Sequence, residues 1–474
     1  MIKFDFDAEL GGADGAVLPV YCEIQPPNVG GQKSLIHVAM PAQHITKTPP
    51  RNPCELSGKC GAFTITMQEV HWHRFPMSSQ STLGLKTIEL LHVGRLTIRY
   101  PPMDTRREIR FHLAPISYLR SESNLIFFGD RSHTEDLFVL NLPNLGTTRF
   151  VAAWTTIHHQ DTEIPGATVI AGFDAIVDLP SESSINVDQM VAKFRSSLEI
   201  LSVLFRQAVT LHGWRYTDDL TVSTWIDSLE PNVTHSAREH RGKFVARPQV
   251  FVECATCLAH AYGNADAKTQ SLVRHLSVAI NPHNNLRTKD RFLFMFSALE
   301  RVIEFAWAQD QTPRSPAVTT HALIQLLEQL KKTVVVEGGE NVYEISARLE
   351  GLIGVVNRPS IRDKFESFLR VYPAMNQYCA DLWPVLGSGK KRGLREVRNA
   401  LTHGSNSFVS PNVIMVAERH LAILLERVIF VLLGMTLPEG ISPDSSLLQI
   451  DVRARAWYER DRWIPLQSKP DQPI

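Results

Sequence analysis

The chain has 474 residues, too many for one ordinary hydrophobic core, so two or three domains are expected. Hydrophobic residues make up 44% and charged residues 21% of the chain, which excludes a disordered protein. The 49 basic and 49 acidic residues give a formal net charge of zero, so any contact with nucleic acid must come from a local basic patch.

Residues 1–180 are expected to form a β-rich N-terminal domain, a sandwich or a barrel. Short β-type runs at 62–67, 96–100 and 137–140 alternate with Gly, Pro and Asn turns. The pairs His71 with His73 and His158 with His159 are imaginable metal ligands. Alternate residues on a strand share a face, however, and such histidine pairs are common without a metal. We therefore expect no metal site there.

Residues 181–284 read as a helical or mixed connecting region. Apolar residues at helical spacing predict a helix over 187–209. Further on, Cys254, Cys257 and His260 have C-x2-C-x2-H spacing within an apolar helix. Zinc would need a fourth ligand, and no second C-x2-C is present, so buried and inert cysteines are the preferred interpretation.

Helical periodicity dominates residues 285–435. Asp290 and Arg291 open a strong helix that carries Glu300 and Glu304 one turn apart. Carboxylates at that spacing repel each other, so at least one should have a basic partner elsewhere. Further helices are expected over 322–331, 343–351 and 362–372, and a last one from Pro411 to a stop at Gly434. Residues 436–474 are expected to be a docking tail.

A soluble, cytoplasmic protein without a membrane partner is expected. The first residues alternate apolar and acidic side chains, like an opening strand and unlike a secretory signal. The most apolar run, 421–433, is interrupted by Glu426 and Arg427 and is too short to span a membrane. Six cysteines at irregular positions do not make a disulfide framework, so a reducing compartment fits best.

The segment 394–404, with the sequence LREVRNALTHG, places several phosphate-binding side chain types on one helix. An α-helix turns by about 100° per residue, so its side chains sort into two arcs. The apolar arc, expected to face a core, consists of Leu394, Val397 and Leu401. The polar arc, expected to be open, consists of Arg398, Thr402, Arg395, Asn399 and His403.

The hexapeptide RNALTH resembles the R-x4-6-H signature of HEPN domains. Arg398 matches the arginine, Asn399 the polar residue that usually follows it, and His403 the histidine. The same loose pattern is met by three other pairs, which are Arg107 with His112, Arg206 with His212 and Arg314 with His321. Context separates the hexapeptide from them, because it lies on a late amphipathic helix that is followed by Gly404 and one more long apolar helix.

A wider resemblance follows from the order of the parts. A β-rich domain followed by a helical bundle is similar to ApeA-type proteins, and the stretch SALERVIE at 297–304 looks like the first long helix of their bundles. The resemblance implies an α+β protein with an all-α HEPN bundle over 285–435. Some family members have an additional E-x3-K/R motif, which Glu366 and Arg370 spell, although any stabilising helix pair would spell it too.

The resemblance implies a metal-independent endoribonuclease without a cofactor. Histidine suits proton transfer near neutral pH, and arginine suits binding of a phosphate. One helix supplies only one histidine, so a homodimer that faces two such helices across a cleft is expected. Lys390, Lys391, Arg392 and Arg395 are candidate RNA contacts along the approach, or else a solvated basic loop.

By resemblance the chain belongs among bacterial abortive-infection effectors that act against phage. Its substrate would be RNA, with tRNA as one candidate, and its N-terminal domain would sense an unknown phage-derived trigger. One alternative is a non-catalytic HEPN scaffold in which Arg398 binds a carboxylate such as Glu300 and His403 only caps the helix. Another is a zinc-dependent nucleic-acid module around Cys254 and Cys257.

Overall fold

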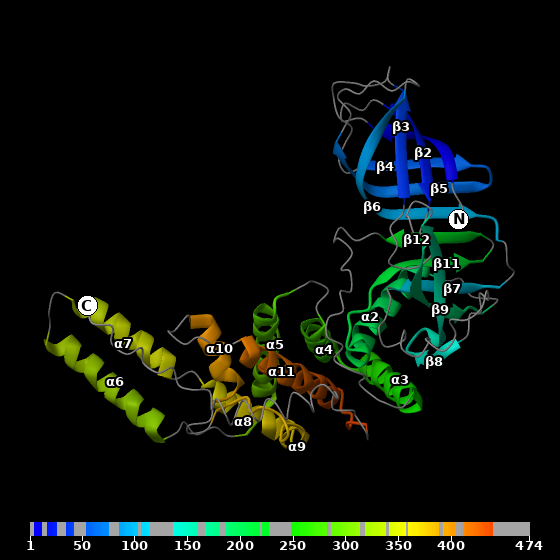
Figure 1. Cartoon of the computed structure of the whole chain (residues 1–474). Coiled ribbons are helices and arrows are strands. Elements are labelled where there is room, and N and C mark those ends of the chain that lie inside the picture. Colours follow the sequence, from blue (N-terminus) through cyan, green and yellow to red (C-terminus); the bar gives the residue numbers. More distant parts are fainter. Residues whose placement is uncertain are drawn as a thin grey trace. The chain divides into compact units, whose positions relative to one another are not determined.

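The computed structural model describes residues 4–11, 17–25, 35–41, 54–74, 85–102, 106–113, 136–159, 166–180, 186–218, 220–226, 248–281, 286–312, 318–337, 341–356, 359–387, 392–403, 409 and 411–438. They form an antiparallel sheet region followed by a helical region, so the predicted α+β layout is confirmed (Figure 1). The chain divides into two compact units, one mainly of residues up to Gln270 and one mainly of Ser271–Ile280 and Leu286–Thr436.

The strands of the first unit pair antiparallel throughout. In chain order they are β1 (Phe4–Gly11), β2 (Val17–Gln25), β3 (Leu35–Pro41), β4 (Cys54–Cys60), β5 (Phe63–Arg74), β6 (Leu85–Tyr100), β7 (Glu108–Leu113), β8 (Asp136–Leu142), β9 (Gly146–His159), β10 (Gly166–Asp178), β11 (Leu211–Thr217) and β12 (Thr221–Ile226). The runs predicted at 62–67, 96–100 and 137–140 fall in or at the edge of β5, β6 and β8.

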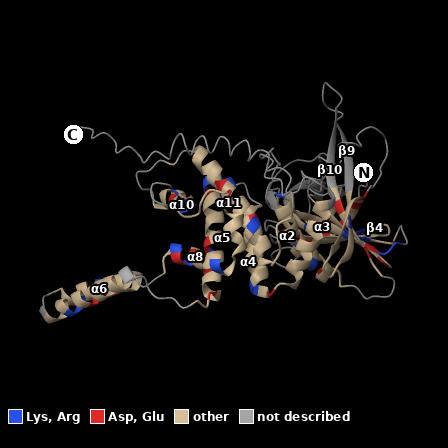
Figure 2. Cartoon of the chain, turned by 90° about the horizontal axis from the view of Figure 1, so that it is seen from below, with Lys and Arg blue, Asp and Glu red and all other residues tan. Residues whose placement is uncertain are grey.

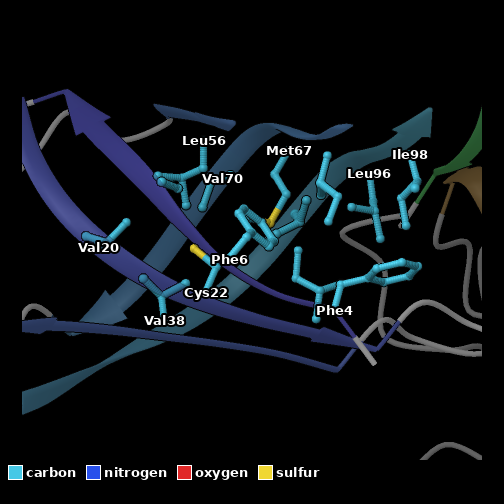
Figure 3. Packing of buried hydrophobic residues seen from close by; sticks show 14 residues of the cluster. Phe4, Phe6, Val20, Cys22, Val38, Leu56, Met67, Val70, Leu96 and Ile98 are labelled. Carbon is cyan, nitrogen blue, oxygen red and sulfur yellow. The ribbon is translucent and has the colours of Figure 1, made fainter. Parts of the chain in front are cut away.

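Strands β1 to β6 close into a barrel. Their order is β3-β2-β1-β4-β5-β6, and β3 also pairs with β6, so the ends of this part of the sheet meet. In β1, Phe4, Phe6 and Ala8 are buried whereas Asp5 and Asp7 are exposed, which is the period of two that places alternate side chains inside. Figure 3 shows Phe4, Phe6, Met67 and Leu96 pointing into the shared apolar interior.

The sheet continues from β6 through β12, β11, β7, β10 and β9 to β8. Strands β11 and β12 follow residue 180, beyond the stretch from which the sheet was predicted. They lie between β6 and β7, which are consecutive in the chain, and strand periodicity does not reveal such an insertion. Helix α2 (Val187–Phe205) packs on this part through Phe194, whose ring stacks on Phe111 of β7 with centroids 3.9 Å apart. Helix α3 (Pro248–Asn264) packs against α2 and β8.

The second unit is helical in its described residues. Its elements are the larger part of α4 (Ala267–Ile280), then α5 (Thr288–Gln309), α6 (Val318–Glu337), α7 (Val342–Val356), α8 (Ile361–Val371), α9 (Ala374–Tyr378), α10 (Leu394–His403) and α11 (Pro411–Leu432). Each helix predicted from periodicity is present, and Gly434 has a φ of 67° just beyond α11, as expected for a helix stop.

The long helix α5 is the centre of this unit. It packs against α8, α10 and α11, and its inward face includes Phe292, Phe296 and Ile303, all fully buried. Arg291 of α5 also forms an ion pair with the buried Glu418 of α11, with N–O distance 3.0 Å. Within the described residues, no helix is both long enough and apolar enough to cross a membrane.

Candidate functional site

Helix α10 is held at its start by the segment before it. Gly393 lies so close to that segment that an added Cβ would come within 2.6 Å of the Gly387 nitrogen and 2.7 Å of the Pro384 oxygen, so a larger residue does not fit. The Glu396 carboxylate accepts hydrogen bonds from the backbone N–H groups of Gly387 and Gly393, at 3.2 and 2.7 Å. The first turn of α10 is therefore fixed in place.

The apolar arc predicted for this helix is buried at Leu394 and Val397, whereas Leu401 is only half-buried. Leu394 and Val397 are fully buried, and α10 packs through this side against α5 and α11. Arg395, Arg398 and Asn399 are half-buried, and Thr402 and His403 are exposed. Figure 2 shows that basic and acidic residues both occur along α10. The helix thus presents its polar side chains at the surface of a packed bundle.

Arg398 has two polar neighbours. Its guanidinium lies 3.4 Å from the Glu300 carboxylate of α5 and donates a 3.3 Å hydrogen bond to the Asn399 side chain oxygen. Both partners of the ion pair are about one-third exposed. This contact is the one expected if Arg398 has a structural role. It also orients the guanidinium, so that its remaining N–H groups can bind an anion.

His403, the last residue of α10, differs from Arg398 in its surroundings. It is exposed and, within the described residues, has no hydrogen-bond or ion-pair partner. Gly404 lies outside the described residues.

The other pairs with the same loose spacing have structural partners. Arg107 forms an ion pair with Asp218 at 2.7 Å, and His112 contacts Asp174 at 2.9 Å. Arg206 is buried at the C-terminal end of α2. On α6, the His321 ring lies 3.0 Å from the Gln325 amide, and Arg314 is outside the described residues.

The basic run before α10 is described only in part. Lys390 and Lys391 lie outside the described residues. Arg392 is half-buried, and its carbonyl accepts a 2.9 Å hydrogen bond from the Trp383 indole. Arg395 is half-buried on the polar arc. Of the four predicted RNA-binding residues, the structure therefore places Arg392 and Arg395 next to the motif.

Glu300 and Glu304 both have basic partners, which confirms the prediction made from their repulsion. Glu300 faces Arg398, and Glu304 forms an ion pair with Lys364 of α8. Lys364 was not anticipated, since the two residues are 60 positions apart and no local pattern links them.

The spacing of Glu366 and Arg370 suggested a stabilising helix pair. Arg370 instead forms its ion pair with Asp310, just beyond α5, at 2.8 Å. The interpretation as a local pair was wrong because the nearly buried Asp310 carboxylate offers a better acceptor than the exposed Glu366.

Of the two α3 cysteines that were expected to be buried, Cys254 is buried and Cys257 is not, so the expectation was wrong for Cys257. Burial, together with the neighbouring Cys257, raises the pKa of the Cys254 thiol to about 12, so it stays protonated near neutral pH. Cys257 is exposed. In the part of the chain that the structure describes, no group of three or more His, Cys, Asp or Glu side chains is arranged to hold a metal ion.

Comparisons with protein-family models, with curated proteins and with solved structures find no match for this chain.

Proposed function

We propose that the chain is a metal-independent endoribonuclease of the HEPN type, with Arg398, Asn399 and His403 as its catalytic residues. The observation that carries the proposal is the polar arc of α10, where Arg398 is oriented by Asn399 and the exposed His403 lies one helical turn beyond Asn399. In the proposed reaction the RNA 2′-hydroxyl attacks the adjacent phosphorus. The bond to the 5′-oxygen breaks, leaving a 2′,3′-cyclic phosphate and a 5′-hydroxyl.

Each side chain has one role in this reaction. His403 transfers a proton, Arg398 binds the non-bridging oxygens as negative charge develops on them, and Asn399 donates a hydrogen bond to the phosphate or orients the imidazole. The reaction needs one group to accept the 2′-hydroxyl proton and another to protonate the leaving oxygen. A homodimer with two-fold symmetry supplies the second histidine from the other copy.

The surroundings fit an anionic substrate in this proposal. Lys390, Lys391, Arg392 and Arg395 precede or flank the motif and would contact phosphates next to the cleaved one. The substrate is RNA, with tRNA as one candidate. The N-terminal unit would sense a phage-derived trigger, so that cleavage stops growth of an infected bacterium.

The Arg398–Glu300 ion pair favours one alternative, a non-catalytic HEPN scaffold. In that case the carboxylate neutralises the arginine permanently, and the bundle serves only in assembly. In the enzyme, Glu300 positions the guanidinium and the phosphate competes for its free N–H groups. The two functions predict different effects of replacing His403: the enzyme would lose RNA cleavage, and the scaffold would be unaffected.

The test is incubation of the purified protein with total RNA in EDTA, with the fragment ends mapped. We expect cleavage with 2′,3′-cyclic phosphate ends, lowered by about 100-fold or more in His403→Ala and Arg398→Ala. His321→Ala is the matched control, because it removes an exposed histidine of the same bundle and should leave cleavage unchanged.

Two results would contradict the proposed ribonuclease activity. One is cleavage that persists in both motif variants. The other is RNA left intact by the wild type, even in cells challenged with phage, together with protection that survives His403→Ala. The second result would support the scaffold.

A further inference from the structure

Helices α6 and α7 form a hairpin that lacks an interior of its own. They pack side by side, and Lys331 of α6 forms a 3.2 Å ion pair with Glu350 of α7, as expected for antiparallel neighbours (Figure 1). None of the side chains described in either helix is buried. Most of the stability of a helix in a protein comes from packing of its apolar face, so a hairpin without buried side chains is expected to have a further packing partner.

Of the eight large apolar side chains that are exposed in the described part of the hairpin, five follow heptad spacing, and Val335, Val336 and Tyr343 do not. Leu323 and Leu330 of α6 are seven residues apart with Leu326 between them, and Ile345 and Leu352 of α7 are also seven apart. Each of the five is between 44% and 53% exposed. A repeat of seven residues favours a helical partner that packs knobs into holes, and not a flat surface.

These side chains lie on one face of the hairpin. The half-buried residues Ile324 and Val334 mark the side of α6 that faces α7, which we call the seam. At about 100° per residue, the three leucines of α6 all lie to the same side of this seam. On α7 Ile345 and Leu352 lie to one side of Leu349. Because the helices run in opposite directions, the two offsets point to the same side. The ion pair of Lys331 and Glu350 falls on the other side by the same geometry. We call the five residues the hairpin face, consisting of Leu323, Leu326, Leu330, Ile345 and Leu352.

The charges of the hairpin argue against a lipid or nucleic-acid partner. Among the side chains described in α6 and α7, three are basic and three are acidic, with His321 in addition. They are Lys331, Lys332 and Arg348, and Glu328, Glu344 and Glu350. A helix that binds an anionic membrane or a phosphate backbone needs an excess of basic residues, which is absent here. The hairpin face itself contains no charge.

The area of the hairpin face agrees with a second copy of this chain as the partner. A helix of 20 residues is about 30 Å long, and two neighbouring helices are about 20 Å wide, so the face covers roughly 600 Å² before the relief of the side chains is counted. Specific interfaces bury about 1,200 Å² or more in total, which is about 600 Å² on each partner, so the face reaches the lower end of this range. An identical face meets this requirement without a second gene product, since two hairpins related by a two-fold axis form a four-helix bundle.

We infer that the hairpin face binds the same face of a second copy of this chain. The interface is separate from the pairing of α10 helices and does not depend on RNA cleavage. A chain with both interfaces would form dimers of dimers, whereas a chain with this interface alone would form dimers. In either case, loss of the hairpin face halves the assembly.

The test is the molar mass of the full chain in solution, measured by light scattering and sedimentation. We expect the wild type to be a dimer or tetramer, and Leu326→Asp and Leu330→Asp to halve its mass, because a buried carboxylate in a bundle seam is strongly unfavourable. Leu326→Ala should raise the dissociation constant of the assembly about tenfold or more, and it guards against misfolding of the charged variants. Gln329→Asp is the matched control, since it places the same charge on the outer side of α6.

Two outcomes would overturn the inference. One is a monomeric wild type, which would mean that another partner or another part of the chain covers the face. The other is an unchanged mass in all three leucine variants. The result is independent of the ribonuclease proposal, because His403→Ala should abolish cleavage and leave the mass unaltered.

Discussion

Asp310 shows how single side chains join the helices of the second unit. Its carboxylate accepts hydrogen bonds from the Ser367 hydroxyl at 2.6 Å, the Arg370 guanidinium at 2.8 Å and the Thr312 backbone N–H at 3.0 Å. The bond from Ser367, followed by those from Thr312 and Arg370, lowers the pKa of Asp310 well below its ordinary value. The ionised carboxylate therefore stabilises the contact of α5 with α8.

Because the folded pKa is lowered, this stabilisation is present above the ordinary pKa and is lost as the pH falls toward the folded pKa. We expect Asp310→Asn to lower the melting temperature by several degrees at pH 7 and by somewhat less at pH 3, which is below the ordinary pKa but still above the lowered one. Glu366→Gln, an exposed position on α8, should have little effect at either pH. Equal effects of the two variants at pH 7 would contradict the role of Asp310. Thermal unfolding followed by circular dichroism is the measurement.

At the scale of elements, closure of the barrel depends on one tight crossing. Strands β1 and β4 meet where Ala8 pairs with Gly58. A Cβ on Gly58 would overlap the Phe6 ring and come within 2.5 Å of the Asp7 carbonyl oxygen. The backbone of β1 cannot yield without disturbing its register with β2. Glycine is thus required there by close approach of the strands.

Gly58→Ala should accordingly destabilise the barrel by about 1–3 kcal/mol, the usual cost of overpacking. Ser57→Ala, at the exposed neighbouring position, should change stability by no more than about 0.5 kcal/mol. The free energy of unfolding by urea, followed by fluorescence, measures both. A Gly58→Ala protein as stable as Ser57→Ala would show that β4 can move away from β1.

At the scale of the whole molecule, the net charge of zero requires the proposed RNA binding to come from a local basic surface. Arg395 lies on the polar arc of α10, whereas Arg348 on α7 is exposed and pairs with Glu344 at 2.6 Å. Replacing either arginine by glutamine changes the net charge equally. Of these two arginines, Arg395 is the one that would contact a phosphate in the proposed complex.

We therefore expect Arg395→Gln to reduce the dependence of RNA affinity on salt, with the slope of log K against log salt falling by about 0.7 for a single strand. Arg348→Gln should leave the slope unchanged. Binding is measured in the His403→Ala background, so that the RNA stays intact. Equal slopes for both variants would place the RNA elsewhere on the molecule.

Local pattern was sufficient for much of this protein. The periods of two and of 3.6 residues predicted the β-rich start, the helical second half and the two arcs of α10, because burial of one face imposes those periods on the sequence itself. The repulsion between Glu300 and Glu304 also showed that a basic partner was needed. The polar arc, with Arg398, Asn399 and His403, could be found from the sequence for the same reason.

Tertiary structure decided which distant residues meet. Closure of the barrel through β3 and β6, insertion of β11 and β12 beside β7, and the partners Lys364 for Glu304 and Asp310 for Arg370 join positions far apart in the chain. No local period encodes such pairings, because they depend on how whole elements pack. The same holds for the hairpin face. In the sequence its apolar residues have the spacing of ordinary core residues, and only the fold shows that they are exposed.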